Sequence, residues 1–125
     1  PSDGRYKEEV VDATAGLSFI NDLRPVTFKW KKEKDLPSDH RAYVEDSETR
    51  TMNGYTNHGF IAQEVKTAID AHSEIKDGFE MWQEDDTDGR QRVGPSALVP
   101  ILVKAIQEQN ALIEALTARI TTLEG

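Results

Sequence analysis

Residues 102–123 read LVKAIQEQNALIEALTARITTL, and apolar side chains recur through them at alternating steps of four and three. Such a period keeps one stripe of a helix facing a partner helix, which is typical of a coiled coil. A single helix packed into the core of a monomer is the alternative. The predicted seam consists of Leu102, Ile106, Gln109, Ile113, Leu116, Ile120 and Leu123.

Isoleucine fills one core position of this seam and leucine the other, a combination that favours two strands in parallel coils. Gln109 places a polar residue in the seam, which fixes the register at some cost in stability. The period alone therefore indicates a dimer. A globular part with threefold symmetry would instead impose a trimer.

The composition bounds the class of protein. The 125 residues suit one domain, and 37% hydrophobic residues suffice for a modest core, so contacts with other subunits are expected. A net charge of -8 without a basic stripe argues against nucleic-acid binding. There is no cysteine, no zinc-ligand spacing among the histidines and no glycine-rich phosphate loop, so no metal, cofactor or nucleotide is predicted. No signal peptide and no apolar run of about 20 residues is visible, so no membrane partner is predicted.

The first half of the chain is predicted to hold a helix, a strand and a polar projection. Apolar residues at helical spacing occupy residues 7–23, with Gly16 as a weak point, and Pro25 ends the pattern. Residues 26–31 alternate between apolar and polar, as in a strand with one buried face. Residues 32–57 are highly charged and lack a sustained apolar period. They therefore form a projection or long hairpin, either functional or a mobile surface insertion.

The second half carries signals for shorter elements. The predicted elements are a short buried strand (59–62), a helix (63–72) and a hairpin (79–83 and 90–93). Asp88 and Gly89 favour a tight reversal inside the hairpin. Ser96 is placed to cap the final helix, and Pro100 is tolerable in its first turn.

The N-terminal segment Ser2-Asp3-Gly4-Arg5-Tyr6-Lys7 places a nucleophile and a candidate base beside one peptide bond. Lysine can remove a serine proton only if its pKa falls from about 10.4 towards 7, which requires burial or a neighbouring cation such as Arg5. Ser2 and Lys7 can meet only if the segment bends, which Gly4 permits, or if they belong to different subunits. Taken alone, the pattern is more typical of a helix cap with a solvated lysine.

Three segments of the chain follow one another in the order found in one known family. They are Ser2 to Lys7, Gly59-Phe60-Ile61-Ala62-Gln63-Glu64-Val65, and residues 98–108 (LVPILVKAIQE). The chain resembles the self-cleaving C-terminal intramolecular chaperones of bacteriophage tailspikes, tail fibres and neck appendages, the endosialidase-type Ser/Lys autoproteases. The resemblance implies a homotrimer with Ser2 and Lys7 as the catalytic dyad of a serine endopeptidase that cuts itself. The cut would lie between Ser2 and Asp3 or at an adjoining bond.

Other polar residues could support the dyad. Asp3 and Arg5 adjoin it in sequence. His58, Gln63 and Glu64 form the other polar cluster of the motifs, and Gln63 or His58 could supply the hydrogen bond that an oxyanion needs. Equally, Gln63 and Glu64 could simply open a helix while His58 lies at the surface.

The resemblance completes the predicted fold. The fold class is α+β: a small mixed domain with a short antiparallel sheet, a long polar projection and a C-terminal coiled-coil helix, assembled as a homotrimer. One intramolecular chaperone and autoprotease domain spans residues 1–125, with a globular part at 1–95, the projection at about 32–57 and the helix at 96–125.

The resemblance also implies a sequence of events. Three chains associate and hold the preceding fibre, spike or appendage segment in register while it folds, with the projection gripping it. The dyad then cuts, which leaves a kinetically trapped trimer. These steps would take place in the host cytoplasm during phage assembly, and the domain would leave the mature virion protein. The alternatives are a permanent, non-cleaving trimerisation or host-binding tip, and a related module of a membrane-tethered eukaryotic transcription factor.

Overall fold

The computed structural model describes residues 2–75 and 78–125. Its chain divides into a helical unit, Pro1–Leu23 with Ala62–Gly125, and a ribbon unit, Arg24–Ile61. The fold is a small mixed α+β domain, as predicted. The prediction of one sheet was wrong, because the strands form two separate two-stranded antiparallel sheets.

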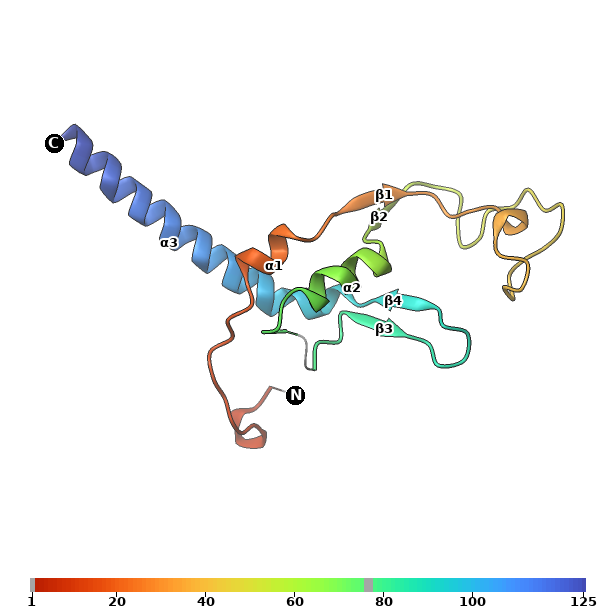
Figure 1. Cartoon of the computed structure of the whole chain (residues 1–125), viewed down its shortest axis with the longest axis horizontal. Coiled ribbons are helices and arrows are strands. Elements are labelled where there is room, and N and C mark those ends of the chain that lie inside the picture. Colours follow the sequence, from red (N-terminus) through yellow and green to blue (C-terminus); the bar gives the residue numbers. More distant parts are fainter. Residues whose placement is uncertain (1, 76–77) are drawn as a thin grey trace. The chain divides into compact units, whose positions relative to one another are not determined.

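The C-terminal helix, α3 (Val99–Glu124), is the longest element (Figure 1). It is rich in Ala, Leu, Glu and Gln, which lose little side-chain freedom in a helix. Pro100 lies in its first turn, as predicted, where the absence of an N–H costs no hydrogen bond within the helix. The prediction that Ser96 caps this helix was wrong. Ser96 lies inside a preceding 3-10 turn, η3 (Pro95–Leu98), and its carbonyl accepts the Val99 N–H.

The core of the helical unit forms around two short helices, α1 (Leu17–Asn21) and α2 (Ala62–Asp70). α1 packs on α3, and α2 packs on the hairpin strands β3 (Trp82–Glu84) and β4 (Gln91–Val93). Phe19 is fully buried, and its ring makes edge contacts with the rings of His72 and Phe79. The buried apolar residues are Ala15, Phe19, Val65, Ala68, Ile69, Ile75, Met81, Leu98, Ile101 and Ala105.

The helix predicted for residues 7–23 was largely wrong, because only its last third is helical. Residues 7–15 form no helix, and Glu9 has a φ of 54°, outside the helical region. Val10 and Val11 are 77% and 84% exposed, so burial within the chain does not stabilise helical turns there. The apolar spacing of this segment therefore does not arise from packing inside its own chain.

Glu108 of α3 fastens α1 to the long helix. Its Oε1 atom accepts a hydrogen bond from the Leu17 N–H at 3.0 Å, which satisfies a donor that the first turn of α1 would leave free. Gly16 permits this approach. A β-carbon at Gly16 would lie 1.9 Å from Glu108 Oε1 and 2.9 Å from Lys104 Cγ.

Gly16→Ala is expected to lower the free energy of unfolding by about 1–3 kcal/mol, because the new methyl group displaces the Glu108 carboxylate from Leu17. The midpoint of urea unfolding measures the change. Gly54→Ala is the matched control, since a β-carbon there has no atom within 4 Å. Its stability should change by less than about 0.5 kcal/mol. Equal midpoints for the two variants would contradict the Glu108 contact.

The predicted hairpin is present. β3 and β4 pair antiparallel through Trp82–Val93, Gln83–Arg92 and Glu84–Gln91. Gly89 has a φ of 70°, the left-handed conformation that glycine adopts without strain, and the loop closes with an Asp85 N–H to Arg90 carbonyl bond of 2.8 Å. The first strand begins at Trp82, three residues later than predicted.

In the ribbon unit, β1 (Val26–Phe28) pairs antiparallel with β2 (Asn57–Gly59). The strand predicted at 26–31 is confirmed over β1. The buried strand predicted at 59–62 was wrong, because β2 ends at Gly59 and is only partly buried. Between the strands the chain makes a 3-10 turn, η2 (Glu33–Asp35), and one isolated bridge that pairs Lys32 with Arg50.

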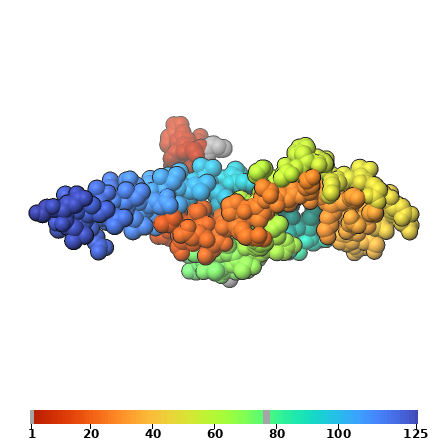
Figure 2. All heavy atoms as spheres, turned by 90° about the horizontal axis from the view of Figure 1, so that it is seen from above, coloured from red at the N-terminus to blue at the C-terminus, as the bar shows by residue number. Residues whose placement is uncertain are grey.

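The predicted seam of α3 faces solvent in the single chain. Its apolar members are between 41% (Leu102) and 85% (Leu123) exposed. Different residues of α3, Ile101 and Ala105, are buried within the chain, as is Leu98 of the preceding turn η3. In Figure 2 no other segment covers the dark blue C-terminal turns of α3 in the view shown. The C-terminal half of α3 therefore does not pack into the core of its own chain.

Candidate functional site

A 3-10 turn, η1 (Gly4–Tyr6), shapes the N-terminal segment. Asp3 caps this turn by accepting the Arg5 N–H at 2.9 Å, and the Arg5 guanidinium binds both carboxylate oxygens of Asp3 at 2.7 to 3.2 Å. The Tyr6 N–H closes the turn on the Asp3 carbonyl at 3.1 Å. The side-chain hydrogen bonds from Arg5, and then its backbone N–H, hold the pKa of Asp3 below its ordinary value. Asp3 and Arg5 thus act as a clasp across the turn.

This turn brings Ser2 and Lys7 together. Lys7 Nζ lies 3.3 Å from Ser2 Oγ, so the amine can donate a hydrogen bond to the hydroxyl. The segment bends at the turn, as the five-residue separation requires. Both side chains are exposed in the single chain, and Arg5, the candidate second cation, is engaged by Asp3. The desolvation that a lysine base needs is therefore not provided by the chain itself.

The other predicted site residues lie on other elements. Gln63 and Glu64 are exposed in the first turn of α2, and the Gln63 carbonyl accepts the Thr67 hydroxyl at 3.1 Å. His58 is exposed on β2, in the ribbon unit. In the described parts of the chain, no hydrogen bond joins the Gln63 or His58 side chain to Ser2 or Lys7. Their support of the dyad stays a prediction.

Comparison with known proteins identifies the family of this chain. A family model described as "Chaperone of endosialidase" matches residues 2–74, more than half of the chain. The chain belongs to this endosialidase-chaperone family. The match includes the Ser2–Lys7 segment and α2, and it ends before β3. No curated protein and no solved structure matches the chain.

The description of the endosialidase-chaperone family names a chaperone, and the family name classes its members as peptidases. The first attribute implies association with a preceding fibre segment. The second agrees with a segment in which a serine hydroxyl lies beside a lysine amine.

This member of the endosialidase-chaperone family also contains a buried histidine between two carboxylates. His72 is 8% exposed, and its Nε2 and Nδ1 atoms lie 2.6 Å from Asp22 Oδ2 and 2.9 Å from Glu74 Oε1. The hydrogen bond to Asp22, followed by that to Glu74, raises the pKa of His72. The pairing joins the end of α1 to the residues after α2. Sequence reasoning missed it because 50 positions separate His72 from Asp22.

The stability of the folded chain is expected to fall as the pH rises through the raised pKa of His72. Unfolded histidine titrates near 6.5, so the pairing stabilises fully below that pH and not at all above the folded pKa. His72→Gln should lower the free energy of unfolding by about 1–2 kcal/mol at pH 6 and by less at pH 9. Thermal unfolding of both proteins at the two pH values gives the difference. A difference that stays constant with pH would argue against a charged imidazole.

An open hollow of about 380 Å³ shares Asp22 with this cluster. Its lining residues are Asp22, Glu64, Thr67, Ala68 and Ala71.

Among residues 2–75 and 78–125, no group of three histidine or acidic side chains is arranged to hold a metal ion. No helix within those ranges combines the length and apolarity that crossing a bilayer requires.

Proposed function

We propose that this domain assists the folding of the fibre, spike or appendage segment that precedes it and then releases itself by autoproteolysis at Ser2. The proposal depends above all on the 3.3 Å separation of Lys7 Nζ and Ser2 Oγ within the segment that the family model matches. A hydroxyl beside an amine is the arrangement of a nucleophile with its general base. The setting we propose is the host cytoplasm during phage assembly, with the domain absent from the mature virion protein.

In the proposed reaction, the neutral Lys7 amine takes the Ser2 hydroxyl proton while Oγ attacks the carbonyl carbon of the scissile peptide. That peptide is Ser2–Asp3 or an adjoining bond. For Ser2–Asp3 the attacking hydroxyl would belong to the dyad of a neighbouring subunit, because attack by Ser2 on its own carbonyl would close a four-membered lactone. The carbon–nitrogen bond then breaks, and the leaving nitrogen takes the proton from Lys7. Water hydrolyses the resulting ester and restores the hydroxyl. Each domain would cut once, because the products separate.

Assembly would supply the desolvation that the single chain lacks. Ser2 and Lys7 are exposed, whereas a lysine base becomes neutral near pH 7 only away from water or beside another cation. We infer that contact with neighbouring subunits covers the dyad, so that cutting follows assembly. The distance between Lys7 and Ser2 favours a dyad within one chain over a lysine that serves a neighbouring subunit.

The exposed seam of α3 is the surface we propose for trimerisation. Three chains joined along this seam would hold three copies of the preceding segment in register. That arrangement removes much of the loop-closure and association cost that slows the folding of intertwined β structures. Once the domain has left, the fibre cannot readily refold after unfolding, so it is trapped kinetically in its native form.

The test is the fate of a longer precursor that contains the preceding segment and this chain. Mass spectrometry of the purified wild-type precursor should show two fragments whose boundary lies next to Ser2. Sedimentation of the C-terminal fragment should show a trimer. A precursor that stays whole while it sediments as a trimer would instead support the permanent, non-cleaving tip.

A further inference from the structure

Asn53 differs from the other asparagines of the chain in that a glycine follows it. The four asparagines are Asn21, Asn53, Asn57 and Asn110. The backbone nitrogen that follows an asparagine can attack its side-chain amide carbon and close a five-membered ring. A side chain on the attacking residue hinders this closure, whereas Gly54 has none and reaches the required backbone angles without strain. The sequence around Asn53 therefore favours the reaction most.

The structure also separates Asn53 from the others by the state of the N–H that follows it. In the described parts of the chain, no hydrogen bond engages the Gly54 N–H. By contrast, the Asp22 N–H donates to a carbonyl of α1 at 3.0 Å. His58 is paired within β2, and Ala111 lies inside α3, where N–H groups bond to carbonyls four residues earlier. The nitrogen after Asn53 is thus free to react, whereas the other three belong to ordered backbone.

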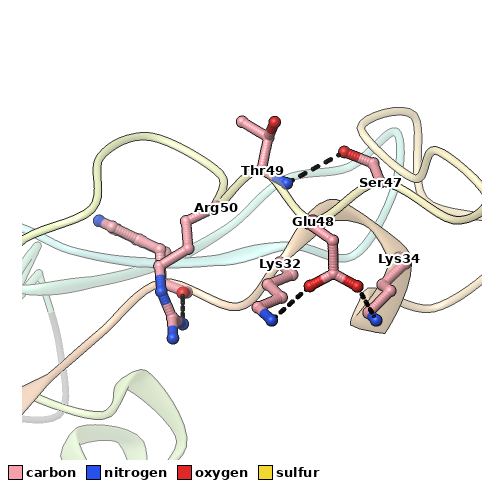
Figure 3. Close-up of polar contacts among 7 residues, drawn as sticks. Lys32, Lys34, Ser47, Glu48, Thr49 and Arg50 are labelled. Carbon is pink, nitrogen blue, oxygen red and sulfur yellow. Dashed lines mark hydrogen bonds and ion pairs between the residues drawn. The ribbon is translucent and has the colours of Figure 1, made fainter.

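Polar contacts join the two arms of the ribbon unit, one that leaves β1 and one that returns to β2. Glu48 on the returning arm lies between the amino groups of Lys32 and Lys34 on the outgoing arm (Figure 3). These hydrogen bonds, first from Lys32 and then from Lys34, lower the pKa of Glu48 to about 2. The Arg50 guanidinium donates to the Trp30 carbonyl across the same arms at 2.8 Å. The loop that follows on the returning arm therefore starts from a defined position.

This loop, residues 51–56, is anchored at both ends and open in the middle. The Thr51 N–H and hydroxyl donate to the Lys31 carbonyl at 2.9 and 3.0 Å, and Asn57 begins β2. The loop itself contains no helix or strand. Gly54 is exposed, and a β-carbon there would have no atom within 4 Å. No described neighbour therefore obstructs the movement that ring closure requires.

The side-chain carbonyl of Asn53 is already polarised. Its Oδ1 atom accepts hydrogen bonds from the Tyr55 N–H at 3.3 Å and from Asn57 Nδ2 at 3.1 Å. Attack by the Gly54 nitrogen would place negative charge on this oxygen, and N–H donors that already point at it stabilise such a charge. The bond from Tyr55 also folds the Asn53 side chain back towards the backbone of the next residue. The loop thus brings the reacting carbon and nitrogen together.

We propose that Asn53 is a self-modification site that converts to aspartate and isoaspartate by deamidation. The Gly54 nitrogen loses its proton to solvent and bonds to the side-chain carbon of Asn53. The bond from this carbon to Nδ2 breaks, and the nitrogen leaves as ammonia with a proton from solvent. Water then opens the cyclic imide. Opening at the side-chain carbonyl gives aspartate, and opening at the backbone carbonyl gives isoaspartate, which carries the main chain through its side chain.

The modification would change the loop in which it occurs. Asn53 Nδ2 donates to Asn57 Oδ1 at 3.1 Å, and a carboxylate cannot donate, so this bond would be lost. The ribbon unit carries seven Lys and Arg against six Asp and Glu, and the new carboxylate would make the numbers equal. Isoaspartate would also lengthen the main chain by one carbon just before β2. This inference does not depend on whether the dyad cuts.

Peptide mapping of the 125-residue chain tests the proposal. The folded protein is kept in a mildly alkaline buffer, sampled over days, digested and sequenced by mass spectrometry, with isoaspartate resolved by chromatography. Asn53 should gain the mass of an amide-to-acid conversion at least about tenfold faster than each of the other asparagines. Modification of Asn53 no faster than that of Asn57, which lies on the same tryptic peptide, would overturn the proposal.

Two substitutions test the chemistry in the folded chain. Gly54→Ala should keep the fold, because the added carbon meets open space, and should slow the modification of Asn53 at least about tenfold. An unchanged rate would refute attack by the nitrogen of residue 54. Asn57→Ala removes one of the two donors to Oδ1 and should slow the reaction about threefold, since a donor has less effect in an exposed loop than in a dry site. A rate that does not fall would contradict the polarised carbonyl.

Discussion

Ser2→Ala and Lys7→Ala are each expected to leave the precursor at full length. The first removes the nucleophile, and the second removes the amine that lies 3.3 Å from it. The nucleophile and its base act as a unit, so the loss of either one removes most of the rate acceleration. Either change should therefore slow cleavage by at least about 10³-fold. Lys7→Arg should be as inactive, because a guanidinium keeps its charge but does not give up its proton. A time course of precursor mass after expression measures all three variants.

Matched control substitutions show whether the loss of cleavage comes from removing the reacting groups themselves. Ser18→Ala and Lys29→Ala remove the same groups from exposed positions outside the N-terminal segment, and both precursors should cut at the wild-type rate. The inactive variants should still sediment as the wild-type assembly does. Cleavage of the Lys7→Arg precursor at the wild-type rate would exclude lysine as the general base.

Ile113→Asp is expected to convert the proposed trimer into monomers. Ile113 lies at the middle of the exposed seam of α3, where threefold assembly would bring three carboxylates together away from water. The concentration needed for assembly should rise by at least about 10³-fold, equivalent to about 8 kcal/mol per trimer, because the dissociation constant of a trimer scales with the square of the concentration. Since the proposed desolvation of the dyad requires neighbouring subunits, the precursor should also remain uncut. Analytical ultracentrifugation and precursor mass measure the two effects.

Ala111→Asp is the control for this experiment. It places the same charge two residues away, on the opposite side of the heptad, and should leave assembly and cleavage unchanged. If the Ile113→Asp precursor is monomeric and still cuts, cleavage does not depend on assembly. A wild-type chain that sediments as a dimer would agree with the pattern of isoleucine and leucine alone.

Elements defined by local periodicity could be predicted from the sequence. Val65, Ala68 and Ile69 are buried on α2 as their spacing predicts, and the Asp88–Gly89 pair marks the hairpin. The segment before α1 shows where such reasoning fails. Its apolar spacing suggests a helix, but no other surface of the chain buries Val10 or Val11. Packing therefore does not stabilise a helix in this segment.

The candidate site shows the same division. Ser2 and Lys7 could be selected from the motif, and a bend between them was required by their separation. The clasp between Asp3 and Arg5 and the contacts of His72 and Glu108 depend on how the chain folds in three dimensions. The positive φ of Met52, 61°, has no sequence signature, because glycine or asparagine would be expected at such a position.

The bond between Glu108 and Leu17 has a mechanical consequence. It fastens the start of α1 to a fixed point on α3, so residues 2–16, which precede α1 and carry Ser2, are attached to the same point. Sliding one long helix by a heptad against its neighbours would therefore shift that subunit's serine by about 10 Å along the axis. By opposing such slippage in the proposed trimer, Gln109 would keep the three Ser2–Lys7 dyads at one level along the axis. The three chains would then be cut in the same plane.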